Sequence, residues 1–481
     1  MTMARECLWR LFPQVCSRIS ELPQDGTLSQ YAKQALTPPF LPQVKADDFI
    51  ECSVNEAKRL FGENRARLLK EELSRQRAVL TANHLCPSYN AEFLQGDLLF
   101  ALQSHCVVPI FAFGGIPLDN GSFPRGMLVA SRDASSFKPY RLPLLTNAWR
   151  RRMVSSAPAF SRKDIEAGLR PCLHAPLSAR ERETVLRVID TVHLAEDVLK
   201  ETSLADQMCA VAVRLWDLVR APSDLPPAVV LDIQAVAKRL IIRDLLEPDS
   251  LVARIVLNEP LTRTIYRELE GRRACWSHAE KERGTFLFWH PTGECRNAAL
   301  RLHPDKPELH AVDGSGFSVA LQPEVLLEAL HSGQLIPSLY LTFAALTMAR
   351  GVICAGGIFQ SDYLPLMIEK TAQSMALFAG QSDPQVVSLR QLAQSEAMSP
   401  FMTGMLPLWT KLETGVCQPA GAIECIAAGG LTKEITEKIA HCRVREAFLA
   451  AAVWFYEEMT PKAERAACWQ QLLAQPAPVL I

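Results

Sequence analysis

The order of apolar and polar positions predicts an α/β unit near the start of the chain. Short apolar runs occupy residues 78–82 and 107–113, and between them residues 91–104 have apolar positions at helical spacing. Runs of this length predict buried strands, and two such strands joined by a helix predict a βαβ unit with parallel strands. A third apolar run, 127–130, follows a loop rich in glycine and proline. This part of the chain is therefore typical of a parallel sheet.

Helical periodicity is predicted for several other stretches. Residues 53–76 carry dense charge pairs, and Ser53 with Glu56 forms the S-x-x-E pattern of a capping box at the predicted helix start. Residues 178–271 are periodic throughout, which predicts helices. Further elements are expected from the same patterns: a hairpin formed by 285–290 and 298–302, a helix over 323–331, and a buried helix over 444–458.

Together these elements predict a Rossmann-like parallel sheet core with large helical insertions and a helical C-terminal region. We expect five segments along the chain. They are an N-terminal helical region and linker (1–75), the first part of the α/β core (76–177), a helical insertion (178–282), the second part of the core (283–400) and a C-terminal helical region (401–481).

Composition and charge narrow the function classes. The chain has 481 residues, 48% of them hydrophobic, so a sizeable core can form and general disorder is excluded. The formal net charge is -1, which argues against a basic nucleic-acid-binding surface. We therefore expect no nucleic-acid partner, and any anion site must be local. The longest apolar stretch, 337–359, is interrupted by Arg350, so we expect no membrane span.

The cysteines indicate a reducing compartment. There are 14 of them and no C-x-x-C pair, so zinc-ribbon and thioredoxin spacings are absent. A chain of this size does not need disulfides for stability, and free cysteines are usually buried. Charged residues near the start, among them Arg5, Glu6 and Arg10, leave no apolar stretch typical of a signal peptide. We expect a cytoplasmic protein, and only Cys86 and Cys354 remain open as site residues.

Candidate chemistry follows from where the loops lie, because common nucleotide and hydrolase motifs are absent. Ligands of open α/β sheets bind beyond the carboxyl ends of the strands. The first such segment, 83–97, holds Asn83, His84, Gln95 and Asp97. His84 can exchange a proton near neutral pH and would lie at a helix N-terminus, where anions bind. The alternative is a histidine that only caps the loop, with an exposed Asp97; Asp97 could also form a salt bridge.

The second segment is the glycine-rich loop 114–126. Its glycines allow backbone N–H groups to approach a ligand, and Asn120 and Arg125 supply donors. Arg125 could hold a phosphate or carboxylate with two hydrogen bonds. The alternative is a tight turn with a surface arginine.

The third segment, 354–363, runs from apolar through small to polar residues. Gly356 and Gly357 permit close backbone approach, and Gln360 and Asp362 supply polar side chains. The alternative is a joint between two elements that needs small residues for packing. The histidines elsewhere are too scattered for a metal site, so none is expected.

Four stretches in order resemble the cysteine-adding ligases of bacillithiol synthesis. They are the strand with Val-Pro-Ile-Phe, the helical LLEPDSLVARIVLNEPLTRTIYRELEG, the hairpin GTFLFWHPTGECRNAALRL, and LQPEVLLEALHSGQLIPSLYLTF before Gly356. The family has a nucleotidyltransferase-like Rossmann core with helical regions. The turn after its first strand differs from residues 83–87 here, as does the segment after its second strand. The resemblance therefore implies a nucleotide or small-molecule site at loops 83–97, 114–126 and 356–363, without the family's substrate.

We expect a small-molecule biosynthetic enzyme, a ligase or transferase that joins an amino acid or thiol to an acceptor. ATP or another nucleotide would be the phosphate-bearing cosubstrate. His84 and Asp362 would be catalytic, and the binding residues would be Asn83, Gln95, Asn120, Arg125, Gly356, Gly357 and Gln360. Two alternatives stay open: a non-catalytic binding protein on the same fold, and a transferase that uses an acyl or aminoacyl donor. The oligomeric state and the substrate are not indicated.

Overall fold

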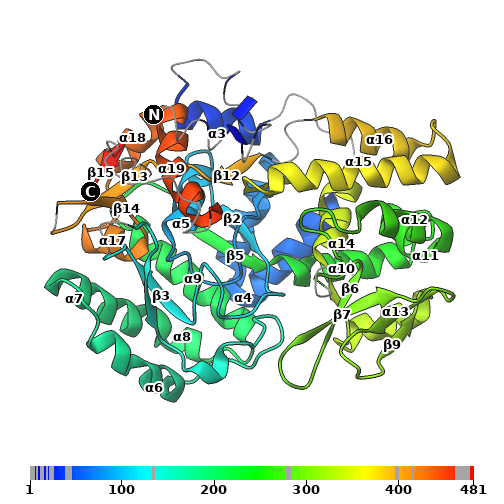
Figure 1. The fold of residues 1–481 in the computed structure, drawn as a ribbon, viewed down its shortest axis with the longest axis horizontal. Helices are drawn as coiled ribbons and strands as arrows, with labels where there is room; N and C mark the ends of the chain where they lie inside the picture. The colour runs from blue at the N-terminus through cyan, green and yellow to red at the C-terminus, as the bar shows by residue number, and fades with distance from the viewer. Residues whose placement is uncertain are drawn as a thin grey trace.

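A computed structural model gives the fold of most of the chain. It describes residues 26–37, 46–132, 136–277, 283–395, 400–413, 415–460 and 477–481, with isolated residues between 6 and 20. Figure 1 shows a central sheet with helices packed around it.

Five parallel strands form the central sheet. They are β1 (Ala78–Leu80), β2 (Val108–Ala112), β5 (Ala228–Asp232), β11 (Ile353–Gly357) and β12 (Phe401–Thr403). Their order in space is β12-β11-β1-β2-β5, and every neighbouring pair is parallel. On one side of β1 lie β2 and then β5, the next two strands along the chain. On its other side lie β11 and then β12, the last two. The strand order therefore reverses between β1 and β11.

The expected βαβ unit is confirmed. The strands β1 and β2 are joined by α5 (Ala91–Ala101), and Leu80 pairs with Ile110 in parallel register. Asn90 caps α5, since its side chain accepts from the backbone N–H of Glu92. A two-stranded antiparallel sheet of β3 (Gly126–Val129) and β4 (Tyr140–Pro143) follows, so the third apolar run lies outside the central sheet.

The expected helical segment 178–282 contains one strand that the sequence analysis missed. The run Ala228–Asp232 is β5, and it pairs with β2 along five residues. The prediction of helices throughout was wrong here because four buried apolar residues stand between helical stretches of similar hydrophobicity. The helices around it are α7 (Ala179–Val188), α8 (Glu196–Leu199), α9 (Leu204–Arg220), α10 (Ile233–Leu245), α11 (Leu251–Leu257) and α12 (Glu259–Leu269), with α6 (Arg162–Leu173) before them.

A second sheet lies at the right of Figure 1, in the order β10-β6-β7-β8-β9. The expected hairpin is confirmed as β6 (Phe288–Pro291) and β7 (Asn297–Leu302), which pair in antiparallel register. The other strands are β8 (Glu308–Ala311), β9 (Ser318–Ala320) and β10 (Ile336–Pro337). The helix α13 (Pro323–His331) matches its predicted range, and α14 (Leu339–Phe343) leads back toward the central sheet.

The C-terminal region is not wholly helical, which corrects the expectation for 401–481. The strand β12 completes the central sheet, and β13 (Leu408–Lys411), β14 (Cys417–Pro419) and β15 (Val479–Leu480) form a small sheet of their own. These runs are only two to four residues long, so their periodicity is not visible in the sequence. The helices are α15 (Gln360–Ala379), α16 (Pro384–Gln394), α17 (Ala422–Ala427), α18 (Lys433–His441) and α19 (Val444–Met459), the last close to its predicted range.

The long helix α4 (Asp47–Arg75) starts earlier than predicted, after α3 (Leu28–Leu36). Ser53 lies inside α4, where its hydroxyl donates to the carbonyl of Phe49, so the expected capping box was wrong. The side chain of Glu56 instead pairs with Arg239 of α10 at 2.6 Å. Among the helices that the structure describes, none is both long and apolar enough to cross a lipid bilayer.

Candidate functional site

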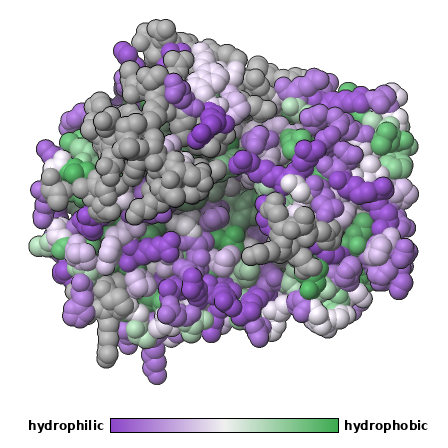
Figure 2. Space-filling model, in the orientation of Figure 1, coloured by the Kyte–Doolittle hydropathy of each residue, from purple (hydrophilic) through white to green (hydrophobic). Residues whose placement is uncertain are grey.

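A cavity of about 1250 Å³ opens at the carboxyl edge of the central sheet. Residues at or just beyond the end of all five strands line it: Thr81, Phe113, Gln234, Gly357 and Thr403. The cavity thus spans the point between β1 and β11 where the strand order reverses, which is where open α/β sheets bind ligands. Figure 2 shows a hollow with apolar residues near the centre of this face.

Both aromatic and charged side chains line the cavity. The volume exceeds the usual range for a site that takes one small molecule. Large aromatic faces favour a flat ring in the ligand, while charged side chains hold polar ends. The aromatic residues are Phe93, Phe113, Phe137, Tyr140, Trp289, Phe359, Tyr363 and Trp454, and the charged ones are Glu92, Arg132, Lys138, Arg141 and Glu457.

His84 lines this cavity, and its hydrogen bonds define its tautomer. Its Nδ1 lies 3.3 Å from Asn120 Oδ1 and 3.1 Å from Ser122 Oγ. The Asn120 amide is held in one orientation, because its Oδ1 accepts from the backbone N–H groups of Ser122 and Phe123 while its Nδ2 donates to a backbone carbonyl. Nδ1 must therefore carry the proton, and Nε2 keeps its lone pair.

Burial sets the charge of His84. Desolvation lowers the pKa of its imidazole below the ordinary value, so the ring is neutral at neutral pH. Nε2 has no hydrogen-bond partner within the described ranges. A neutral imidazole with a free Nε2 in a ligand-sized cavity can act as a general base. Of the two residues that the sequence analysis proposed as catalytic, only His84 lies at the cavity.

Asn83 and Gln95, which were predicted to bind the ligand, make structural contacts instead. Asn83 Nδ2 donates to Asp97 Oδ1 at 2.8 Å and to Ser88 Oγ at 3.0 Å. Gln95 Nε2 donates to the carbonyl of Leu408 at 2.8 Å, and its Oε1 accepts from the N–H of the same residue. Neither Asn83 nor Gln95 lines the large cavity. Gln95 therefore joins α5 to β13.

The loop 114–126 reaches the site through Asn120 and Ser122 rather than through Arg125. The guanidinium of Arg125 donates to the carbonyl of Leu145 at 3.1 Å and lies 3.7 Å from Asp119. Its backbone has a φ of 60°, the left-handed conformation that turns require. Arg125 is not among the residues that line the cavity. The cations that do reach the rim are Arg132, Lys138 and Arg141.

The loop 354–363 contributes Gly357 and Gln360 to the cavity. Gln360 Nε2 donates to Thr81 Oγ1 at 2.9 Å and to the carbonyl of Cys354 at 2.8 Å, which ties β1 to β11. Gly356 must lack a side chain because a Cβ there would overlap the amide of Gln360. Asp362 points elsewhere: its side chain is 52% exposed, lies 3.5 Å from Arg273 Nε, and does not line the cavity.

The first turn of α15 faces the same space. Its N-cap, Phe359, lines the cavity together with Gly357 and Ile358, and no side chain caps the helix. Backbone N–H groups at a helix start carry partial positive charge and bind anions. Lys138 and Arg141 lie at the same cavity, so the site offers two kinds of donor to a negatively charged group.

The cysteines that the sequence left open are not activated. Cys86 and Cys354 are both buried, and desolvation raises the pKa of each thiol to about 12. Both are therefore protonated at neutral pH and poor nucleophiles. Within the described part of the chain, no three His, Cys, Asp or Glu side chains are grouped as metal ligands.

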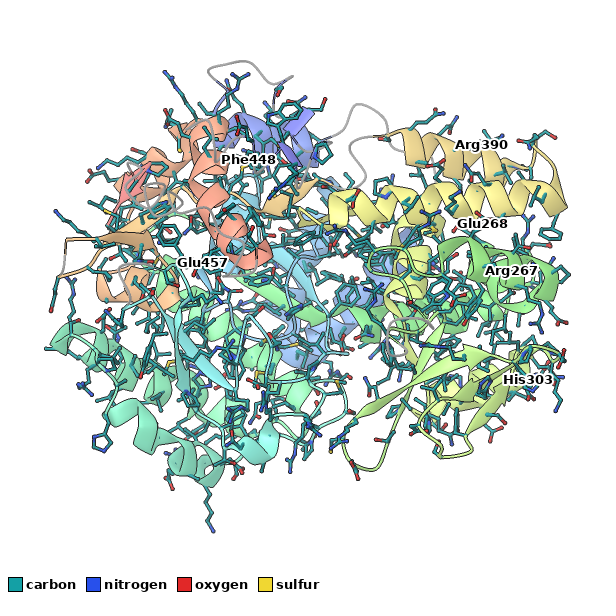
Figure 3. All side chains as sticks on the ribbon, viewed as in Figure 1. Arg267, Glu268, His303, Arg390, Phe448 and Glu457 are labelled. Atoms are coloured by element: carbon teal, nitrogen blue, oxygen red, sulfur yellow. The ribbon has the colours of Figure 1, made fainter. Side chains whose placement is uncertain are left out.

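Several residues of the site come from segments that the sequence analysis did not connect to it. Glu457 of α19 is 4% exposed and accepts from Ser136 Oγ and from the N–H of Phe137, both at 2.6 Å. It thus holds the segment just before β4, which includes Lys138, and Figure 3 shows Glu457 on α19 to the left of centre. The sequence does contain a signal for Glu457, since an acidic residue lies within a helix that was predicted to be buried.

Comparisons with known proteins give no family for this chain. No protein-family model matches it. No curated protein matches it. No solved structure matches it. The geometry of the site is therefore the basis on which a function can be assigned.

Proposed function

We propose that the protein is a cytoplasmic small-molecule biosynthetic enzyme of the ligase or transferase type, with a Rossmann-like core that binds a phosphate-bearing cosubstrate such as ATP. The observation that carries the proposal is the cavity itself. It collects the ends of five parallel strands at the point where their order reverses, beside a neutral histidine. A non-catalytic binding protein would also have a cavity at the ends of its strands. The free Nε2 of His84 favours catalysis over binding alone.

The phosphate groups would lie at the start of α15. The start of α15 lies beside Gly357 at the cavity and would offer them the partial positive charge of a helix N-terminus. Lys138 and Arg141 are exposed and would hold charge at the rim. An aromatic base would stack on a ring such as Trp289.

His84 would act on the second substrate, an amino acid or a thiol. Its Nε2 takes the proton from the attacking nitrogen or sulfur as that atom bonds to the activated acceptor, and the phosphate-bearing group leaves with the electron pair. Asn120 and Ser122 hold the ring while it gains charge. General-base catalysis of this kind contributes roughly 10²- to 10⁴-fold to a rate.

A thermal-shift screen tests the proposal. ATP, GTP, CTP, an aminoacyl donor, an acyl donor and cysteine are added to the protein singly. A nucleotide is expected to raise the melting temperature, since a ligand that binds only the folded state stabilises it. A shift with acyl donors alone would favour the acyl transferase, and binding without turnover would favour a binding protein.

A pair of matched variants tests where the phosphate groups of the nucleotide bind. The double variant Lys138→Ala, Arg141→Ala should weaken nucleotide binding about tenfold, on the order of the loss expected for exposed charge contacts. Arg267→Ala is the control: this arginine lies on α12 at the right of Figure 3, away from Glu457. Equal binding by the double variant and the control would contradict the proposed phosphate position.

A further inference from the structure

A second, much smaller cavity lies beside the large one. Its volume is about 10 Å³, which is room for one water molecule. Its polar lining consists of Asn83, His84, Ser88 and Asp97. Cys86 and apolar residues of β2, β5, α5 and α9 form the rest of its wall. His84 lines both cavities.

The side chain of Asn83 needs a partner at this place. Asn83 is 3% exposed, and both hydrogen bonds of its Nδ2, to Asp97 and Ser88, hold the amide in one orientation. Its Oδ1 is buried and has no hydrogen-bond partner within the described ranges. A buried unpaired acceptor costs about 1–3 kcal/mol. A water molecule in the small cavity could satisfy it, because Asp97 and Ser88 supply the further polar contacts that such a water requires.

We propose that the small cavity binds one ordered water between Asn83 Oδ1 and the Asp97 carboxyl group, and that Asp97 acts through this cluster as a positioning residue that tunes His84. The inference rests on the proposed role of His84 as a base. It assigns to Asp97 an influence on the imidazole without contact with the substrate: when Asp97 ionises, its charge stabilises the imidazolium and makes His84 a stronger base.

The protonation equilibria agree with this arrangement. Burial raises the pKa of Asp97 to about 7, although hydrogen bonds from Ser88 and Asn83 oppose the rise. Asp97 therefore changes charge near neutral pH, inside a region of low dielectric. The other titratable groups that line either cavity are Cys86, Glu92, Arg132, Lys138, Tyr140, Arg141, Tyr363 and Glu457. Of these, Cys86 is the one at the small cavity, and burial raises the pKa of its thiol to about 12.

Nuclear magnetic resonance tests the coupling directly in the full chain. The imidazole signals of His84, assigned with His84→Gln, are followed from pH 5 to 9. We expect a second inflection near pH 7 that reports the ionisation of Asp97. The isosteric variant Asp97→Asn should abolish it, and Ala112→Val, which fills the small cavity from β2, should shift or abolish it by displacing the water.

Asp232→Asn is the matched control. Desolvation also raises the pKa of buried Asp232 to about 7, but Asp232 caps α10 and does not line the small cavity, so the inflection should persist. An unchanged His84 titration in folded Asp97→Asn would overturn the coupling. A high-resolution crystal structure without density beside Asn83 Oδ1 would overturn the water site. None of these readouts depends on nucleotide binding, so their failure is distinguishable from failure of the proposed function.

Discussion

Gln360 and Thr81 lie 279 residues apart in the sequence, yet their side chains meet at 2.9 Å and join two neighbouring strands. Thr81 follows β1 and Gln360 begins α15 directly after β11, so their contact bridges the point where the strand order reverses. Both residues are buried and both line the cavity. The contact between Gln360 and Thr81 therefore lines the candidate site and also holds β1 and β11 together.

Replacing Gln360 with alanine should destabilise the protein and loosen the site. The change removes the amide that bonds Thr81 Oγ1 and the carbonyl of Cys354, and an unpaired buried group costs about 1–3 kcal/mol. Urea unfolding should show a loss of roughly 2–4 kcal/mol, given the cavity that also forms. Gln373→Ala, at an exposed position of the same helix, should change stability by less than about 0.5 kcal/mol. Equal losses in the two variants would contradict the bridging role.

His84→Gln should separate binding from catalysis. Glutamine keeps a polar side chain but has no basic nitrogen, so the thermal shift with a nucleotide should remain while turnover falls by about 10²-fold or more. The comparison uses His331→Gln, an exposed histidine at the end of α13, which should leave both properties unchanged. If His84→Gln lost the thermal shift with a nucleotide but kept its turnover per bound ligand, a role of His84 as general base would be excluded.

The sequence predicted which loops line the cavity better than it predicted which of their side chains do. The loops after β1, β2 and β11 all reach the cavity, because the carboxyl ends of parallel strands share one edge. Arg125 and Asp362 were expected in the pocket, but the direction of a loop side chain depends on tertiary contacts with residues such as Leu145 and Arg273. Those contacts are remote in the sequence and leave no local pattern.

The missed strands have a similar physical reason. A three-residue strand such as β12 has too few positions to show alternation, and β5 lies between helices of equal hydrophobicity. Their place in the sheet is set by hydrogen bonds to β11 and β2. Lys138 and Glu457 were missed because the sequence gives no sign that β4 and α19 meet at this cavity.

Arg350→Met should be among the most destabilising single changes. The guanidinium is 5% exposed and pairs with Asp48 of α4 at 2.6 Å and with Asp244 of α10 at 2.9 Å. Removing one partner of a buried ion pair leaves uncompensated charge, which costs about 3–5 kcal/mol. Arg390→Met on α16, a partly exposed position at the upper right of Figure 3, is the control and should be close to neutral. Similar unfolding midpoints in urea for both variants would refute the anchoring role.

The contribution of Asp97 to stability should fall as the pH rises from about 4 to 7. Burial raises the pKa of Asp97 from 3.8 to about 7, so the folded protein binds a proton in this window that the unfolded chain releases. Asp97→Asn removes this dependence, because asparagine does not ionise. Its free energy of unfolding relative to the parent should therefore be higher at pH 8 than at pH 5, by roughly 2–3 kcal/mol.

Buried His193 acts in the opposite direction. Burial lowers its pKa to about 3, so its contribution is lost as the pH falls from 6.5 toward 3. Comparing pH 5 with pH 8 within the Asp97→Asn pair cancels that effect, because both proteins contain His193. The exposed carboxylate of Asp362 provides the control, and Asp362→Asn should leave the pH profile of the parent in place. An Asp97→Asn profile parallel to that of the parent would show that Asp97 is ionised in the folded protein throughout this range.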